Sequence, residues 1–186
     1  EYKADPNLRK KLIEQMGFLE GSRALTVNGD KEEEKEDEGL LEEEEIKNYR
    51  KCAATLNYLS QDSPDVSFGT KEACRGMAAP KRGDYRRMKK VVRYILGRKE
   101  VVWRFEWQKE KPRWRIFTDS DWASDTNDRK SVSGSLGFLM GNLIVWGSKR
   151  QVTVALSSCE AEYYAIADGM KAVSYTHLRA HETSED

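Results

Sequence analysis

The chain has 186 residues, and its 32 Lys and Arg side chains balance 32 Asp and Glu side chains. No apolar run approaches the roughly 20 residues of a membrane-spanning helix, so we expect no membrane partner. The three cysteines are odd in number and far apart, which excludes a disulfide framework and paired-cysteine zinc sites and indicates reduced thiols. The sequence does not begin with Met and has no signal-peptide pattern, so we expect an intracellular segment of a longer polypeptide.

The first part of the chain combines one helical pattern with a block of acids. Residues 1–30 contain one predicted helix. Asp5 can cap its start, Pro6 suits its first turn, and Gly17 can end it. Residues 31–45 are dense in Asp and Glu, and like charges at this density repel one another. We therefore expect a disordered acidic linker there.

Residues 46–112 predict a helical segment that carries a basic helix. Apolar residues recur at helical spacing from Ile46, and Ser63-Pro64 breaks this helix and starts another that runs toward Met77. A third helix over 85–97 has an apolar stripe, and cations coat its remaining surface. Such cation density is typical either of a solvated helix face or of a surface that contacts phosphates. The candidate nucleic-acid-binding residues are Arg86, Arg87, Lys89, Lys90 and Arg93.

Alternating patterns in the second part of the chain predict strands over 101–107 and 113–119. Residues 132–140 and 143–148 predict a hairpin that turns at Gly141-Asn142, and a helix is expected from Ser157 to about Ala172. The fold class is therefore α+β or α/β, with a mostly helical first part. Residues 113–172 should form a three-stranded antiparallel sheet with one helix packed on it.

Two carboxylates are candidates for chemistry. Asp119 stands at the end of a predicted strand, and Glu162 lies among small apolar residues in the first turns of the last helix. Ser157 and Glu160 fit a capping box, so Glu160 should turn back to its own helix start. Asp119 and Glu162 should approach each other closely enough to bind the same divalent metal ions. The positive charge of such ions relieves the repulsion between the two carboxylates. The alternative for each acid is a structural role, as a turn cap or as a helix residue.

Four motifs in this order resemble the ribonuclease H region of Ty1/copia-type retrotransposon polyproteins. They are residues 118–123 (TDSDWA), 128–134 (DRKSVSG), 146–151 (WGSKRQ) and 154–163 (VALSSCEAEY). Upstream segments, including KKVVRYILG at 89–97, resemble the connection between the polymerase and that nuclease. The family usually has Thr where this chain has Val132 and Cys159.

The resemblance implies a catalytic site and its partners. Asp119 matches the first catalytic carboxylate and Glu162 the second, with Asp121 as a weaker metal ligand, and the cofactor would be Mg²⁺ or Mn²⁺. The substrate would be an RNA/DNA hybrid, and the partner would be the rest of the polyprotein with its polymerase domain. The location would be a cytoplasmic particle or the nucleus.

Part of the family pattern is missing. The third and fourth carboxylates of the family have no counterpart here, and residues 173–186 resemble a translated sequencing adapter. We therefore expect a truncated ribonuclease H-like domain over 113–172 that is inactive as it stands. Two alternatives are a non-catalytic nucleic-acid-binding module that uses the basic 81–99 helix, and a different nuclease or integrase on the same core.

Overall fold

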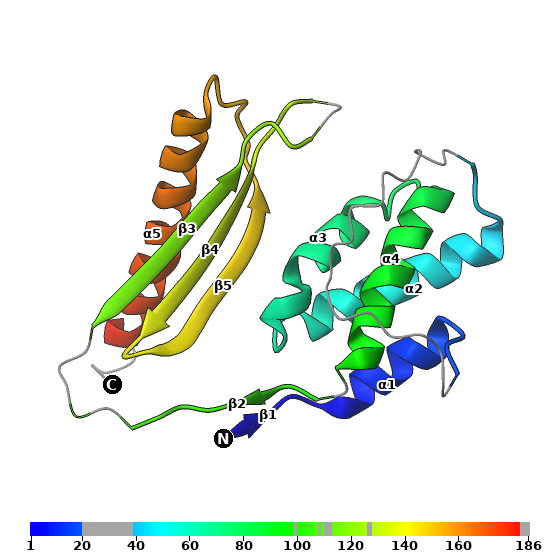
Figure 1. The fold of residues 1–186 in the computed structure, drawn as a ribbon, viewed down its shortest axis with the longest axis horizontal. Coiled ribbons are helices and arrows are strands. Elements are labelled where there is room, and N and C mark those ends of the chain that lie inside the picture. Colours follow the sequence, from blue (N-terminus) through cyan, green and yellow to red (C-terminus); the bar gives the residue numbers. More distant parts are fainter. Residues whose placement is uncertain (20–38, 99, 108, 110–112, 126–127, 183–186) are drawn as a thin grey trace. The chain divides into compact units, whose positions relative to one another are not determined.

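The computed structural model describes residues 1–19, 39–98, 100–107, 109, 113–125 and 128–182, and the side chains of the last helix up to residue 174. The chain divides into two compact units, Glu1–Arg104 and Phe105–Asp186. The first unit is mainly helical, and the second holds a three-stranded antiparallel sheet with one long helix (Figure 1). This arrangement confirms the α+β class. No described helix is long and apolar enough to cross a membrane.

The first unit packs four α-helices and one short 3₁₀ helix. Its two short strands, β1 (Tyr2–Lys3) and β2 (Val102–Trp103), pair antiparallel. The elements are β1 (Tyr2–Lys3), α1 (Pro6–Gln15), α2 (Glu43–Leu59), η1 (Pro64–Val66), α3 (Ser67–Arg75), α4 (Arg82–Gly97) and β2 (Val102–Trp103).

Local signals in the sequence set the ends of the first helices. The Asp5 carboxylate accepts a hydrogen bond from the backbone N–H of Asn7 at 2.9 Å, and Gly17 has φ +71° just after α1. A left-handed residue is the usual way to end a helix, because its backbone turns the chain away from the helix axis. The predicted α1 and both of its boundary signals are therefore confirmed.

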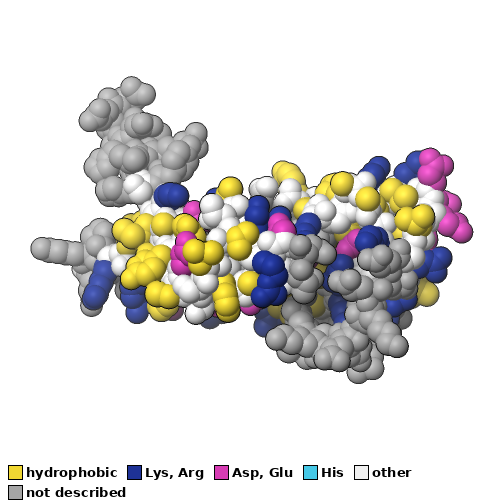
Figure 2. Space-filling view, turned by 90° about the horizontal axis from the view of Figure 1, so that it is seen from above, with side chains coloured by type: hydrophobic (Ala, Val, Ile, Leu, Met, Phe, Trp, Pro, Cys, Tyr) yellow, Lys and Arg dark blue, Asp and Glu magenta, His cyan; other side chains and the backbone are white. Residues whose placement is uncertain are grey.

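The acidic segment differs from the prediction at its end. Residues Glu43–Glu45 form the first turn of α2, and the Glu45 carboxylate accepts a hydrogen bond from the backbone N–H of Glu42 at 3.1 Å. Acids are favourable in this position because the first turn of a helix carries partial positive charge. Figure 2 shows acidic side chains together where α2 begins. Residues 31–38 of the predicted linker lie outside the described part.

The core of the helical unit is built from the predicted apolar stripes. Along α4, Met88, Val92 and Ile95 are buried, and Tyr85 packs against them at the edge of the core. Tyr49 and Leu56 of α2 are completely buried in the same cluster. Burying one large apolar side chain stabilises a fold by about 1.5–3 kcal/mol, so this cluster holds the four helices together and turns the cations of α4 outward.

The second unit contains the predicted antiparallel sheet, with strand order β3-β4-β5. Its strands are β3 (Trp114–Asp121), β4 (Val132–Leu139) and β5 (Asn142–Arg150). Asp119 pairs with Gly134, and Ser120 pairs with Ser133. The helix α5 (Ser158–Glu182) lies along one face of this sheet and packs against β3 and β4 (Figure 1).

Small residues allow α5 to lie close to the sheet. Ala161, Ala165 and Gly169 of α5 are buried, at intervals of four residues along one side of the helix. A Cβ atom added to Gly169 would come within 2.6 Å of the Thr118 Cγ2 atom. The close approach thus depends on glycine at this position, and it places Thr118 on the face of β3 that α5 covers.

The opposite face of the sheet remains exposed and partly apolar. Phe117 of β3 is 56% exposed and Leu136 of β4 is 41% exposed. The Phe117 ring meets the Phe138 ring edge to face, with 5.7 Å between their centroids. Figure 2 shows further hydrophobic side chains gathered on the surface of this unit.

Three boundaries differ from the sequence predictions. The hairpin turns at Met140-Gly141, with φ +52° and +82°, rather than at Gly141-Asn142; two left-handed residues match the twist of the flanking strands. Only Val102–Trp103 of the predicted 101–107 strand belongs to a β-strand, and it pairs with β1 rather than with the three-stranded sheet. The last helix continues to Glu182 instead of ending near residue 172.

Candidate carboxylate site

The strand that carries the predicted catalytic Asp119 ends with polar residues that are alternately half-buried and exposed. In β3, Thr118 and Ser120 are half-buried, whereas Asp119 and Asp121 are exposed. Successive side chains of a strand point to opposite faces, so Asp119 and Asp121 project from the face opposite α5. Neither carboxylate forms a hydrogen bond or ion pair with any described residue.

Glu162 reaches the same strand end from α5. Its Oε1 atom accepts two hydrogen bonds from Ser120, one from the backbone N–H at 3.1 Å and one from the hydroxyl at 2.9 Å. The Glu162 carboxylate is thus anchored to Ser120, which directly follows Asp119 in the sequence. The Asp119 side chain, however, lies on the other face of β3. The structure brings together the two predicted segments through Ser120, a residue that sequence reasoning missed.

Glu160 serves the helix start, as predicted, although its carboxylate bonds the backbone of Leu156, the residue before the predicted N-cap Ser157. Its carboxylate accepts hydrogen bonds from the Leu156 N–H at 2.6 Å and from the Tyr164 hydroxyl at 3.0 Å. The Ser157 hydroxyl accepts a hydrogen bond from the Glu160 N–H at 3.1 Å. With Glu160 occupied in this way, Glu162 is the acid of this motif that faces the sheet.

A buried polar network lies behind the two acids. Gln151, the residue after β5, is 4% exposed, and its side-chain N–H₂ group donates to Ser133 Oγ at 2.9 Å and to the Ala161 carbonyl at 2.8 Å. The backbone N–H of Gln151 donates to the Ser131 carbonyl at 2.9 Å, and Ser131 Oγ accepts from the Ala123 N–H at 3.0 Å. Sequence reasoning assigned no role to Gln151 or Ser131, although both stand inside the quoted motifs.

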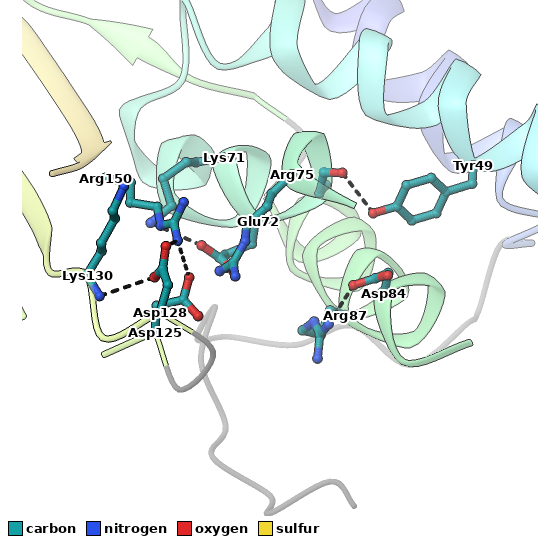
Figure 3. Close-up of polar contacts among 11 residues, drawn as sticks. Tyr49, Lys71, Glu72, Arg75, Asp84, Arg87, Asp125, Asp128, Lys130 and Arg150 are labelled. Atoms are coloured by element: carbon teal, nitrogen blue, oxygen red, sulfur yellow. Dashed lines mark hydrogen bonds and ion pairs between the residues drawn. The ribbon is translucent and has the colours of Figure 1, made fainter. Parts of the chain in front are cut away.

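The loop between β3 and β4 is tied to the end of β5 by charge. Arg150 forms ion pairs with Asp125, at 2.9 Å, and with Asp128 (Figure 3). The hydrogen bond that Arg150 donates to the Asp128 carboxylate is the main cause that raises the pKa of Arg150. Asp128 Oδ1 also accepts a hydrogen bond from the Lys130 N–H at 3.2 Å. These contacts order the part of the motif at 128–134 that precedes β4.

The metal-binding capacity of the described residues is limited. Carboxylate oxygens are suitable ligands for Mg²⁺, and Asp119, Asp121 and the Oε2 atom of Glu162 supply them without competing partners in the described part of the chain. However, no three Asp, Glu, His or Cys side chains among the described residues are grouped so that they could hold a metal ion. The described site thus offers part of a ligand set.

The predicted basic helix is α4, and its cations lie on its outer side. Arg86, Arg87 and Arg93 are exposed, whereas Lys89 and Lys90 are half-buried. Several cations have partners in the unit. Arg87 pairs with Asp84 at 2.5 Å (Figure 3), Lys89 lies 4.8 Å from the centre of the Tyr85 ring, and Arg93 lies 5.6 Å from that of Phe18.

Comparison with known proteins finds retrovirus-related Pol polyproteins from transposons among the relatives of this chain. The chain is 36% identical over 121 residues to the uncharacterized mitochondrial protein AtMg00810 of Arabidopsis thaliana, across 64% of this chain and 49% of that protein. It is 32% identical over 120 residues to the retrovirus-related Pol polyprotein from transposon RE2 of Arabidopsis thaliana, across 64% of this chain and 8% of the polyprotein. It is also 33% identical over 105 residues to the retrovirus-related Pol polyprotein from transposon TNT 1-94 of Nicotiana tabacum, across 56% of this chain and 8% of the polyprotein.

The chain matches only part of each of these relatives. The chain spans about half the length of AtMg00810 and less than a tenth of each polyprotein. No protein-family profile and no solved structure matches the chain. The sequence identity is sufficient to establish common ancestry with the polyproteins, and the chain is therefore homologous to a segment of copia-type retrotransposon Pol polyproteins.

Proposed function

We propose that this chain is the ribonuclease H region of such a polyprotein, which in the intact protein cleaves the RNA strand of RNA/DNA hybrids. The observation that carries the proposal is the pair of hydrogen bonds from Ser120 to Glu162. They join the strand end that bears Asp119 to the helix that bears the second acid. The homology to Pol polyproteins from transposons supports the same function, because the four sequence motifs resemble the ribonuclease H region of such polyproteins.

The acids of this chain would act as metal ligands. Asp119 and Glu162 would each offer carboxylate oxygens to Mg²⁺ or Mn²⁺ at the end of β3, from its two faces, with Asp121 as an additional oxygen donor. A pair of bound metal ions supplies an activated water and stabilises the leaving oxygen of a phosphodiester. Ser120 occupies one oxygen of Glu162 and orients the other. The described residues supply only part of the ligands that two ions need, so the intact site requires further groups.

Mn²⁺ binding tests this proposal directly. Titration of the chain with Mn²⁺, followed by the loss of the free-ion electron paramagnetic resonance signal, should show weak binding that Asp119→Asn and Glu162→Gln each reduce. Asp168→Asn is a matched control, because Asp168 lies on the same helix and pairs with Lys149 and Lys171 instead. Equal binding by all four proteins would overturn the assignment of the two acids.

A second candidate function is binding of nucleic acid without catalysis, through the outer side of α4. The exposed positions of Arg86, Arg87 and Arg93 support it, together with the buried stripe that fixes the orientation of the helix. Asp84 pairs with Arg87 and offsets part of its charge.

The salt dependence of binding tests this second function. The logarithm of the binding constant falls with the logarithm of salt concentration by about 0.9 for each phosphate contact with duplex DNA. Replacing Arg86, Arg87, Lys89 and Lys90 by Ala should therefore flatten the slope measured by fluorescence anisotropy. A control variant with Lys10 and Lys11 of α1 replaced by Ala should keep the slope. An unchanged slope in the four-residue variant would show that this side of α4 is only solvated.

A further inference from the structure

Gln151 connects the sheet to the backbone of α5 at one defined point. Its side-chain nitrogen donates to Ser133 Oγ of β4 and to the carbonyl of Ala161, in the first turn of α5. A carbonyl oxygen can only accept a hydrogen bond, so the N–H₂ end of the carboxamide must face Ala161. Gln151 is itself buried and is held by its backbone bond to Ser131.

The bonded carbonyl belongs to the residue before Glu162. Any shift or rotation of the first turn of α5 that breaks the bond to Ala161 also displaces the Glu162 carboxylate. The other contacts of this turn are less directional. Ala161 and Ala165 pack by shape alone, and the cap formed by Ser157 and Glu160 lies within the segment around the helix start.

The position of Glu162 matters because β3 is an edge strand of the described sheet. A backbone N–H that points away from the neighbouring strand at a sheet edge has no ladder partner. The Ser120 N–H finds its partner in Glu162 Oε1. The protection of this single amide therefore reports whether the Glu162 carboxylate is in place.

We propose that Gln151 is a positioning residue, which sets the first turn of α5 so that Glu162 reaches Ser120 beside the Asp119 strand end. The functional meaning of this positioning rests on the proposed ribonuclease function, in which Glu162 is a metal ligand. The positioning itself is a property of the fold and can be measured without catalysis.

The test is hydrogen exchange of the Ser120 amide in the full chain, followed by nuclear magnetic resonance. Gln151→Met keeps the length of the side chain and removes both donated hydrogen bonds. We expect it to accelerate Ser120 exchange by roughly tenfold, the effect of losing one net hydrogen bond, and Glu162→Gln to weaken the same protection. Gln61→Met, at an exposed glutamine of the helical unit, is the control and should leave Ser120 unchanged.

Two further measurements separate positioning from general unfolding. The Leu136 amide of the central strand β4 should keep its protection in Gln151→Met. If that variant does not fold, Ser133→Ala removes one partner of the carboxamide and should give a smaller acceleration at Ser120. Unchanged Ser120 exchange in a folded Gln151→Met or in Ser133→Ala, or equal acceleration at Leu136, overturns the proposal.

A metal titration of the same variants distinguishes this inference from the proposed function. If the unmodified chain binds Mn²⁺ through Glu162, Gln151→Met should weaken that binding. The factor by which the dissociation constant rises should be about the factor by which Ser120 exchange accelerates. If the unmodified chain binds no Mn²⁺, the metal-ligand role of Glu162 fails. The exchange of Ser120 in Gln151→Met then still decides whether Gln151 positions the carboxylate.

Discussion

Glu162 of α5 accepts hydrogen bonds from both the backbone N–H and the hydroxyl of Ser120 in β3. One carboxylate oxygen thus satisfies an amide at a strand edge and fixes a helix against a sheet. Asp119, the neighbour of Ser120, projects from the other face of the strand and remains exposed. The strand end therefore presents one anchored acid, Glu162, and two unpaired acids, Asp119 and Asp121, among the described residues.

The first prediction concerns this anchor. Ser120→Ala removes the hydroxyl bond and leaves the backbone bond, so the free energy of unfolding should fall by about 1.5–3 kcal/mol, because the lost bond has a charged acceptor. Urea denaturation followed by circular dichroism measures this change. Ser124→Ala is the control, since Ser124 is exposed in the following loop. Equal stability of the two variants would mean that the Ser120 hydroxyl contributes nothing to the anchor.

The second prediction concerns the close contact between α5 and β3. Gly169→Ala should destabilise the chain by about 1–3 kcal/mol through overpacking, because the new Cβ would lie 2.6 Å from the Thr118 Cγ2 atom. At an uncrowded helix position the same change stabilises by roughly 0.5–1 kcal/mol, so the sign of the effect is diagnostic. Thr118→Ser removes the crowding methyl group, and it should recover part of the loss in the double variant. Thermal denaturation of the single and double variants provides the measurement.

The third prediction concerns a buried arginine in the helical unit. Arg9 is 2% exposed, donates to Ser63 Oγ at 2.7 Å and lies 4.0 Å from the Asp65 carboxylate. Burial is the main cause that lowers the pKa of its guanidinium. Arg9→Met should cost about 3–5 kcal/mol, because it leaves buried polar partners without compensation.

The matched control for Arg9 is its exposed neighbour in α1. Lys10→Met removes a charge of the same sign from the solvent side of the helix and should change the free energy of unfolding by less than about 0.5 kcal/mol. Urea unfolding of both variants compares the buried and the exposed cation. Similar losses would contradict a structural role for Arg9.

The fourth prediction is a loss of stability in alkali. Burial raises the pKa of the Cys52 thiol from 9.0 to about 11, and burial also raises the pKa of the Tyr49 hydroxyl. The unfolded chain loses the Cys52 proton first, so it binds fewer protons than the folded chain between these two pH values. The free energy of unfolding must therefore decrease as the pH rises through this range.

Urea midpoints at several pH values from 8 to about 11 measure this decrease. Cys52→Ala removes the thiol and should show a shallower decrease, with the contribution of Tyr49 retained. The exposed Cys159 offers a control, because Cys159→Ala should keep the slope of the unmodified chain. A slope that is the same in all three proteins would rule out Cys52 as a source of the effect.

The fifth prediction is that the chain by itself does not cleave RNA/DNA hybrids. The described residues form no group of three metal-binding side chains, and the loss of one well-placed electrostatic group already costs roughly 10²–10³ in rate. An assay with labelled hybrid and Mg²⁺ or Mn²⁺ should show no cleavage above that of Asp119→Asn. Metal-dependent cleavage that Asp119→Asn abolishes would show that the described acids are sufficient.

Much of the fold follows from local signals in the sequence. The cap at Asp5, the capping box at Ser157 and the apolar stripe of α4 predict helices that the structure contains. These signals work because each involves residues within one or two turns of the same helix. The different roles of Glu160 and Glu162 also follow from a local signal. A capping box needs a carboxylate three residues after the N-cap, and Glu160 is the acid at that position.

The roles of the candidate site residues remain predictions, but their sequence order was sufficient to select them. The four motifs single out Asp119 and Glu162, and homology to Pol polyproteins now supports the family that the motifs resemble. The catalytic and metal-binding roles of both acids depend on the experiments above.

Only the tertiary structure decided which partners these residues have. The alternation of β3 predicts that Asp119 and Ser120 face opposite sides, but the side that α5 covers depends on packing between segments some 40 residues apart. The same holds for the contact of Gln151 with Ala161 and for the burial of Arg9, whose partner Ser63 is 54 residues away. Short-range periodicity determines the elements, whereas hydrogen bonds between distant segments depend on how the apolar faces of those elements pack together.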